Sequence, residues 1–172
     1  MLTLSIFRHA KAAAGDTATK DFDRPLAESG HAAAPLMGAY LANEGLKPDL
    51  VLSSPALRTR ETCTAAFKAL QPPPEIRFEQ VLYLASPKTL IGRLRRTAPS
   101  IRHVMVVGHN PGLQALALDL IASAPPKMLA DLGTKLPTAG LVVLRLDIAG
   151  WTEIGPATAS LDRFVTPRML AA

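Results

Sequence analysis

The sequence predicts an α/β protein: a three-layer αβα sandwich around a mostly parallel sheet, with an antiparallel hairpin at one edge. Three observations lead to this prediction. Short apolar runs rich in Val, Ile and Leu alternate with segments of helical periodicity through the first two-thirds of the chain. A helix-start signal or a loop follows each run. Two late runs lie close enough in sequence to form a hairpin.

Four of the apolar runs are predicted to form the parallel part of the sheet. They are residues 2–8, 49–53, 76–78 and 103–107. The hairpin is predicted to pair residues 140–147 with residues 151–154, and the tail after Gly155 is expected to be irregular. Because the carboxyl ends of parallel strands share one edge of a sheet, the turns after these runs should lie together.

Helices are predicted between the strands. The first begins near Ser29 and ends near Asn43, with Gly45 as the residue just beyond it. Residues 11–27 are expected to form a polar loop, and residues 127–138 receive no assignment. Three further helices are expected to begin at cap-and-proline pairs, namely Ser54–Pro55 (reaching about residue 70), Ser86–Pro87 (ending before Pro99) and Asn110–Pro111 (ending before Pro125).

Composition narrows the class of protein. The 172 residues, with 48% apolar and 19% charged side chains, fit one domain spanning residues 1–172. Cys63 is the only cysteine, which excludes a disulfide scaffold and a cysteine zinc site. No secretory signal and no run near the ~18 apolar residues of a membrane span is visible, so we expect a cytoplasmic protein that does not enter the membrane.

Charge indicates the kind of partner. The formal net charge of +5 favours an anionic substrate or an acidic protein partner. Basic residues form no long tract and aromatic residues make up only 5%, so we expect no nucleic-acid partner.

Two arginines and two histidines follow the predicted strands. Arg8 and His9 end the first run, Arg58 lies just beyond the second, and His109 follows the run at 103–107. Taken alone, His9 is more often a structural histidine bonded to a carbonyl. Arg8 changes that interpretation, because an arginine near the core is costly to bury without an anion and its forked donors match phosphate oxygens.

The helix positions of Arg58 and His109 support an anion site. A cation in the first turn of a helix is unfavourable unless an anion binds between it and the free backbone N–H groups. Gly108 allows close backbone approach beside His109. His31 and His103 lack such settings and are expected on a helix surface and at a strand entry. A metal bound by His9 and His109 is disfavoured, because the arginines would repel it.

These motifs resemble the histidine phosphatase superfamily, which has the phosphoglycerate mutase-like fold. Ile6-Phe7-Arg8-His9-Ala10 resembles its Arg-His-Gly signature, with Ala10 in place of the usual glycine. The segments of residues 53–62 and 107–111 resemble its second arginine and second histidine motifs. Length and motif order are most similar to SixA-type phosphohistidine phosphatases, and the resemblance extends over nearly the whole chain.

The resemblance implies a phosphatase with a histidine nucleophile, a phosphohistidine intermediate and no cofactor. His9 is the expected nucleophile, and Arg8, Arg58 and His109 are expected to hold the phosphoryl oxygens. Arg24 is either a further clamp or an ordinary turn arginine. Many members have an acidic proton donor after the third strand, and Glu79 is the candidate for it here.

The weak signal for a proton donor bears on the substrate. An alkoxide leaving group needs a proton, whereas a protonated imidazole leaves with little help, so we expect a protein phosphohistidine as substrate. The alternative is a broad phosphatase of small phosphoesters or sugar phosphates on the same scaffold. A non-catalytic module that binds phosphorylated partners is disfavoured, because binding alone does not need both His9 and His109.

Overall fold

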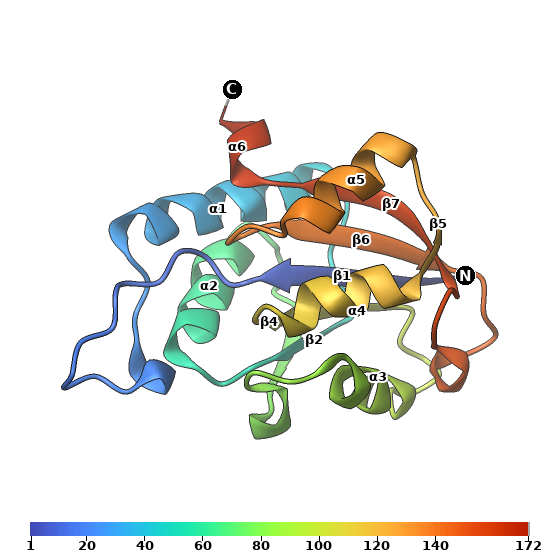
Figure 1. Ribbon diagram of the computed structural model, residues 1–172, viewed down its shortest axis with the longest axis horizontal. Helices are drawn as coiled ribbons and strands as arrows, with labels where there is room; N and C mark the ends of the chain where they lie inside the picture. Colours follow the sequence, from blue (N-terminus) through green and yellow to red (C-terminus); the bar gives the residue numbers. More distant parts are fainter. Residues whose placement is uncertain (172) are drawn as a thin grey trace.

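The computed structural model describes residues 1–171 and confirms the α/β fold (Figure 1). Its strands are β1 (Leu2–Arg8), β2 (Leu50–Ser53), β3 (Glu75–Phe78), β4 (His103–Gly108), β5 (Ile121–Ser123), β6 (Leu141–Leu146) and β7 (Ala159–Val165). Over the described residues they form one seven-stranded sheet in the order β3-β2-β4-β1-β6-β7-β5. Neighbours from β3 to β1 are parallel, and β6 is antiparallel to both β1 and β7.

Helices cover both faces of this sheet. They are α1 (Glu28–Asn43), α2 (Leu57–Phe67), α3 (Pro87–Arg95), α4 (Gly112–Leu120), α5 (Pro126–Thr134) and α6 (Pro167–Leu170), with 3-10 turns η1 (Asp21–Asp23), η2 (Gln80–Leu82) and η3 (Trp151–Glu153). Residues of α1 and α2 belong to one buried cluster, and residues of α3, α4 and α5 belong to another. The sheet therefore forms the middle of three layers.

The two clusters follow from the two-residue period of the strands. In β1, Leu4 and Ile6 join the cluster under α4, whereas Phe7 joins the cluster under α1. All three side chains are fully buried. Burial of an apolar side chain of this size stabilises the fold by roughly 2 kcal/mol. The central strands are thus fixed on both faces, and the residues that follow them start from rigid positions.

The predicted hairpin partner is wrong. Residues 151–153 form η3, and the strand paired with β6 is β7, in the tail that was expected to be irregular. Trp151 lies in the core instead, where its Nε1 donates to the carbonyl of Ile101 at 2.7 Å. A register shift in the β6–β7 pairing leaves Asp162 out of the ladder, which breaks the two-residue alternation in the tail sequence. That interruption hid the strand.

Two more elements were not predicted. β5 is three residues long and follows α4 directly, too short to show a period. α5 occupies most of the segment that received no assignment, and its one buried residue, Leu132, gives a weak apolar stripe. By contrast, Gly45 has the left-handed φ of +66° expected just beyond α1, and Ser86 caps α3 as predicted.

None of the helices within residues 1–171 combines the length and apolar character needed to cross a membrane. The cytoplasmic location stays a prediction.

We expect Gly38→Ala to destabilise the fold, because α1 and α2 touch backbone to backbone at this glycine. A Cβ on Gly38 would lie 1.9 Å from the Ala66 carbonyl oxygen, so the loss should be about 1–3 kcal/mol of unfolding free energy in a urea titration. Gly92→Ala in α3 is the control: nothing lies within 4 Å of its Cβ, and it should stabilise by up to about 1 kcal/mol. Equal stability of the two variants would contradict this packing.

Candidate active site

A cavity of about 390 Å³ lies at the carboxyl ends of β1 and β4, beside the first turn of α2. We call it the anion cavity. Five of the predicted site residues meet there: Arg8, His9, Arg24, Arg58 and His109. The other lining residues are Lys11, Ala12, Asp21, Leu84, Asn110 and Thr138. The expected convergence of residues distant in sequence is therefore present.

The backbone after β1 fixes the ring of His9. Its Nδ1 lies 2.7 Å from the carbonyl oxygen of Ala10, and a carbonyl only accepts, so Nδ1 bears the proton and Nε2 has the free lone pair. Burial lowers the pKa of His9 to about 4, and the charges of Arg58 and Arg8 add to that effect. His9 is consequently a neutral imidazole near pH 7, with Nε2 available as a nucleophile.

His109 lies beside His9, with the ring centroids 5.3 Å apart. Burial lowers its pKa to about 3, and the nearby charge of Arg58 acts in the same direction. Its Nε2 is 2.7 Å from Ser54 Oγ, which also accepts a hydrogen bond from the amide of Ala56 at 3.3 Å. In the tautomer in which the Ser54 hydroxyl donates to Nε2, the Nδ1 of His109 bears the proton and is an N–H donor.

The predicted helix caps are wrong at both ends that border the cavity. Ala56 precedes α2 in place of Ser54, and Pro111 precedes α4 in place of Asn110. Ser54 binds His109 instead. Asn110 Nδ2 donates to the Leu136 carbonyl at 2.9 Å, while its Oδ1 still accepts from the amide of Gln114 in the first turn of α4 at 3.2 Å. The site thus uses polar side chains that the sequence pattern assigned to capping.

Two guanidinium groups line the anion cavity, that of Arg58, which is buried, and that of Arg8, which is partly buried. Arg58 is 3% exposed and donates to the backbone oxygen of Asp21 at 2.7 Å and to its carboxylate at 3.1 Å. Arg8 Nη1 donates to the Leu136 carbonyl at 3.0 Å, and burial together with the charge of Arg58 lowers the pKa of Arg8. Within residues 1–171, the buried atoms Arg8 Nε, Arg58 Nε and His109 Nδ1 have no hydrogen-bond partner. Unpaired buried donors of this kind favour a bound anion.

The loop before α1 contributes Asp21, which sequence reasoning missed. Its carboxylate accepts from Arg58, from Arg24 Nε at 3.1 Å and from the hydroxyl of Tyr83. The Tyr83 hydrogen bond and the charge of Arg58 lower the pKa of Asp21 to about 2. One acidic residue in a polar loop resembles any surface charge, so no signal in a single sequence identified it.

The structure gives no support to Glu79 as the proton donor. Both of its carboxylate oxygens accept from Arg93, at 2.6 and 3.1 Å, and Glu79 does not line the anion cavity. These hydrogen bonds from Arg93 lower its pKa, which keeps it ionised. Glu79 therefore serves to fix α3 against the end of β3.

No group of three His, Cys, Asp or Glu side chains that could hold a metal ion occurs in the described part of the chain. The prediction that the protein needs no cofactor stays a prediction, which treatment with a chelator would test.

We expect Asp21→Asn to tighten the binding of tungstate, a tetrahedral oxyanion that mimics phosphate. Removing a like charge from the edge of the cavity should strengthen binding by roughly fivefold, the effect of one charge at ~4 Å in a solvated site. Isothermal titration calorimetry measures this. Asp23→Asn, which alters an exposed neighbour outside the cavity lining, should leave the dissociation constant unchanged. Weaker binding in Asp21→Asn would contradict the expectation.

The pKa of His9 predicts its titration by NMR. The folded-state pKa lies below the ordinary value, so the ring stays neutral as pH falls from 7 to 5 and gains a proton only near pH 4. ¹⁵N-labelled histidine spectra, with His9 assigned by comparison with His9→Ala, should show a proton on Nδ1 at pH 7. A midpoint above pH 6 would refute the buried neutral imidazole.

Comparisons with known proteins agree with this site. The sequence model of the histidine phosphatase superfamily (branch 1) matches residues 4–80, which include Arg8, His9 and Arg58. An uncharacterised protein of Mycobacterium tuberculosis is 37% identical over 164 residues, covering 94% of this chain and 99% of its own.

Two solved structures extend the similarity to the fold. A protein from Agrobacterium tumefaciens described as a SixA phosphohistidine phosphatase is 31% identical, with a TM-score of 0.82 over 96% of this chain and 98% of its own. A protein from Nakamurella with the same description is 25% identical, with a TM-score of 0.80 over 96% of each chain. The chain therefore belongs to the histidine phosphatase superfamily, with a SixA-like, phosphoglycerate mutase-like fold, and is a phosphatase.

Proposed function

We propose that this phosphatase removes the phosphoryl group from phosphohistidine side chains of other proteins. One observation supports this substrate above all: the part of the anion cavity formed by residues 1–171 offers no protonated carboxylic acid. Asp21 is the carboxylate in its lining, and its pKa of about 2 keeps it ionised near neutral pH. A phosphoester that releases an alkoxide needs a proton from such a group, whereas a phosphohistidine that is protonated on its second ring nitrogen releases a neutral imidazole without one.

Transfer between two imidazoles suits this arrangement. In the proposed first step, the substrate phosphohistidine bears a proton on its second ring nitrogen and Nε2 of His9 attacks phosphorus in line. A new P–N bond forms at His9, and the P–N bond to the substrate histidine breaks, so that this histidine leaves as a neutral imidazole. Because bonds of the same kind form and break, the step needs no strong general acid. Water then attacks the phosphohistidine at His9, and the products are inorganic phosphate and free His9.

The cationic lining would stabilise the charge on the transferred group. In this proposal Arg8, Arg58 and the Nδ1–H of His109 hold the equatorial phosphoryl oxygens, and Arg24 lies at the edge of the cavity as a further clamp. Asp21 holds Arg58 and Arg24 in position through its hydrogen bonds. Preorganised positive charge of this kind usually supplies much of the rate in phosphoryl transfer.

The surroundings of the cavity fit a side chain presented by another protein. Lys11 and Leu84 line the cavity, and both are exposed, so the entrance lies at the molecular surface. The similarity to the Agrobacterium protein described as a SixA phosphohistidine phosphatase supports the same substrate class.

A substrate panel tests the proposal. A phosphohistidine protein should be hydrolysed with a kcat/KM at least about 100-fold above that for glycerol phosphate and sugar phosphates, because only the esters lack the proton they need. His9→Ala should abolish turnover of all substrates and the transfer of label from ³²P-phosphohistidine to the enzyme. His31→Ala, which alters an exposed histidine on α1, should behave as wild type.

Faster turnover of the esters would overturn the proposed substrate and favour a phosphatase of small phosphoesters. Label transfer to His9→Ala would overturn His9 as the nucleophile.

A further inference from the structure

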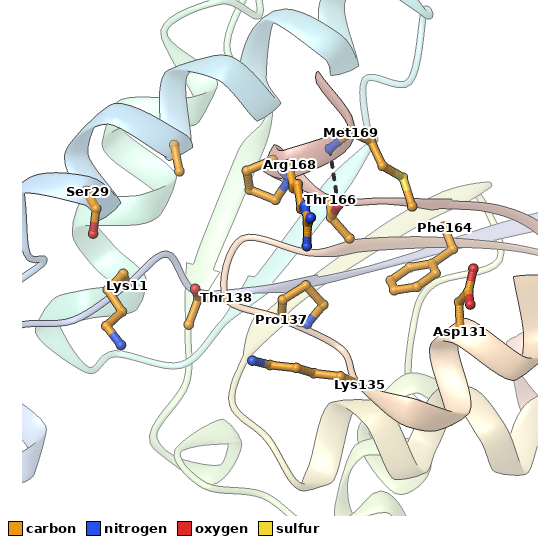
Figure 2. A pocket seen from close by; sticks show the side chains of 12 residues that line it. Lys11, Ser29, Asp131, Lys135, Pro137, Thr138, Phe164, Thr166, Arg168 and Met169 are labelled. Carbon is orange, nitrogen blue, oxygen red and sulfur yellow. Dashed lines mark hydrogen bonds between the residues drawn. The ribbon is translucent and has the colours of Figure 1, made fainter. Parts of the chain in front are cut away.

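A second cavity, of about 630 Å³, adjoins the anion cavity (Figure 2). We call it the groove. It shares Lys11 and Thr138 with the anion cavity. Other residues of its lining are Asp131, Lys135, Pro137, Phe164, Arg168 and Met169. A substrate whose phosphoryl group occupies the anion cavity can therefore extend into the groove.

One short connection joins the two cavities. Residues 135–140 link α5 to β6, and Lys135, Pro137 and Thr138 of this connection line the groove. The carbonyl between them, that of Leu136, accepts hydrogen bonds from Arg8 at 3.0 Å and from Asn110 at 2.9 Å. The Leu136 side chain is fully buried. The wall of the groove is therefore anchored to two residues of the anion cavity.

The groove has an excess of positive charge. Lys11, Lys135 and Arg168 are all exposed and form no ion pair with any residue in the described range. The carboxylate in the lining, Asp131, is already paired with Lys127 at 2.9 Å. Three unpaired cations beside one neutralised carboxylate attract an anionic group.

The groove also has an apolar surface. Phe164, Pro137 and Met169 line it, and Met169 is 52% exposed. In Figure 2 the ends of the Lys11, Lys135 and Arg168 side chains lie around Pro137 and Thr138, on the side of the anion cavity, while Phe164 and Asp131 lie at the other end. An occupant that fits has its negative charge next to the phosphoryl group and an apolar group further away.

We propose that the groove binds the segment that flanks the phosphohistidine on the partner protein, through an acidic side chain near the phosphohistidine and an apolar side chain beyond it. This inference rests on the proposed function, since a histidine side chain in the anion cavity brings its own polypeptide over the groove. The acidic side chain lies between Lys11, Lys135 and Arg168, and the apolar side chain packs on Pro137 and Met169, beside the small exposed part of Phe164. The groove thereby selects among phosphohistidine proteins.

Matched phosphohistidine peptides and charge-reversal variants test this. One peptide has glutamate and leucine beside the phosphohistidine, and the other has glutamine in place of glutamate. Lys135→Glu and Arg168→Glu should each raise KM for the glutamate peptide roughly fivefold to tenfold with kcat nearly unchanged, because the attraction becomes repulsion. Neither variant should change KM for the glutamine peptide or for a small aryl phosphate by more than about twofold.

Lys68→Glu is the control for the change in net charge, since Lys68 is exposed at the end of α2 opposite Arg58 and lines a different cavity. It should leave all three substrates unaffected. Equal KM values of wild type for the two peptides, or an equal rise for both in the groove variants, would overturn the groove as the selecting surface while the proposed function stands. Absence of phosphohistidine turnover by wild type, with the aryl phosphate still hydrolysed, would overturn both.

Discussion

A buried guanidinium, that of Arg58, and a partly buried one, that of Arg8, lie beside two neutral imidazoles, and this is the constraint on which the rest of the site depends. The two like charges cannot share one cavity at low cost unless negative charge lies near them. Asp21 provides part of it through hydrogen bonds to Arg58. The same positive field, added to burial, holds the pKa of His9 and His109 well below the ordinary value. In the proposed mechanism, the arginines that would hold the phosphoryl oxygens thus also help burial to keep His9 neutral.

The sheet supplies the rigidity that this arrangement needs. β1 and β4 are parallel neighbours in the interior of the sheet, with apolar clusters on both faces, and His9 and His109 follow them directly. Backbone groups then complete the placement: the carbonyl of Ala10 orients His9, and the amide of His9 donates to Gly108 at 3.1 Å. The side chain of His9 is thus oriented by the rigid backbone rather than by another flexible side chain.

Much of this could be predicted from the sequence because the signals are local. Apolar runs in the sequence predicted the strands β1, β2, β3 and β4. The positions just after these runs predicted that His9, Arg58 and His109 belong to the site. What failed depended on contacts distant in sequence. The bulge at Asp162 hid β7. Ser54 binds His109 instead of capping a helix, and Asn110 binds the distant Leu136 carbonyl in addition to an amide of α4. Glu79, the expected proton donor, pairs with Arg93, whereas Asp21, for which no role was expected, pairs with Arg58. Only the folded structure shows which carboxylate meets which arginine.

The Leu136 carbonyl couples the position of residues in the anion cavity to the wall of the groove. It accepts from Arg8 and Asn110 in the anion cavity, while its neighbours Pro137 and Thr138 form a wall of the groove. A shift of this connection displaces the Arg8 guanidinium along with it. Changes of sequence between α5 and β6 therefore affect the site of phosphoryl chemistry as well as the proposed recognition of the partner. The groove can vary at Lys135 and Arg168 more freely than at residues 136–140, which lie next to the Leu136 hydrogen bonds.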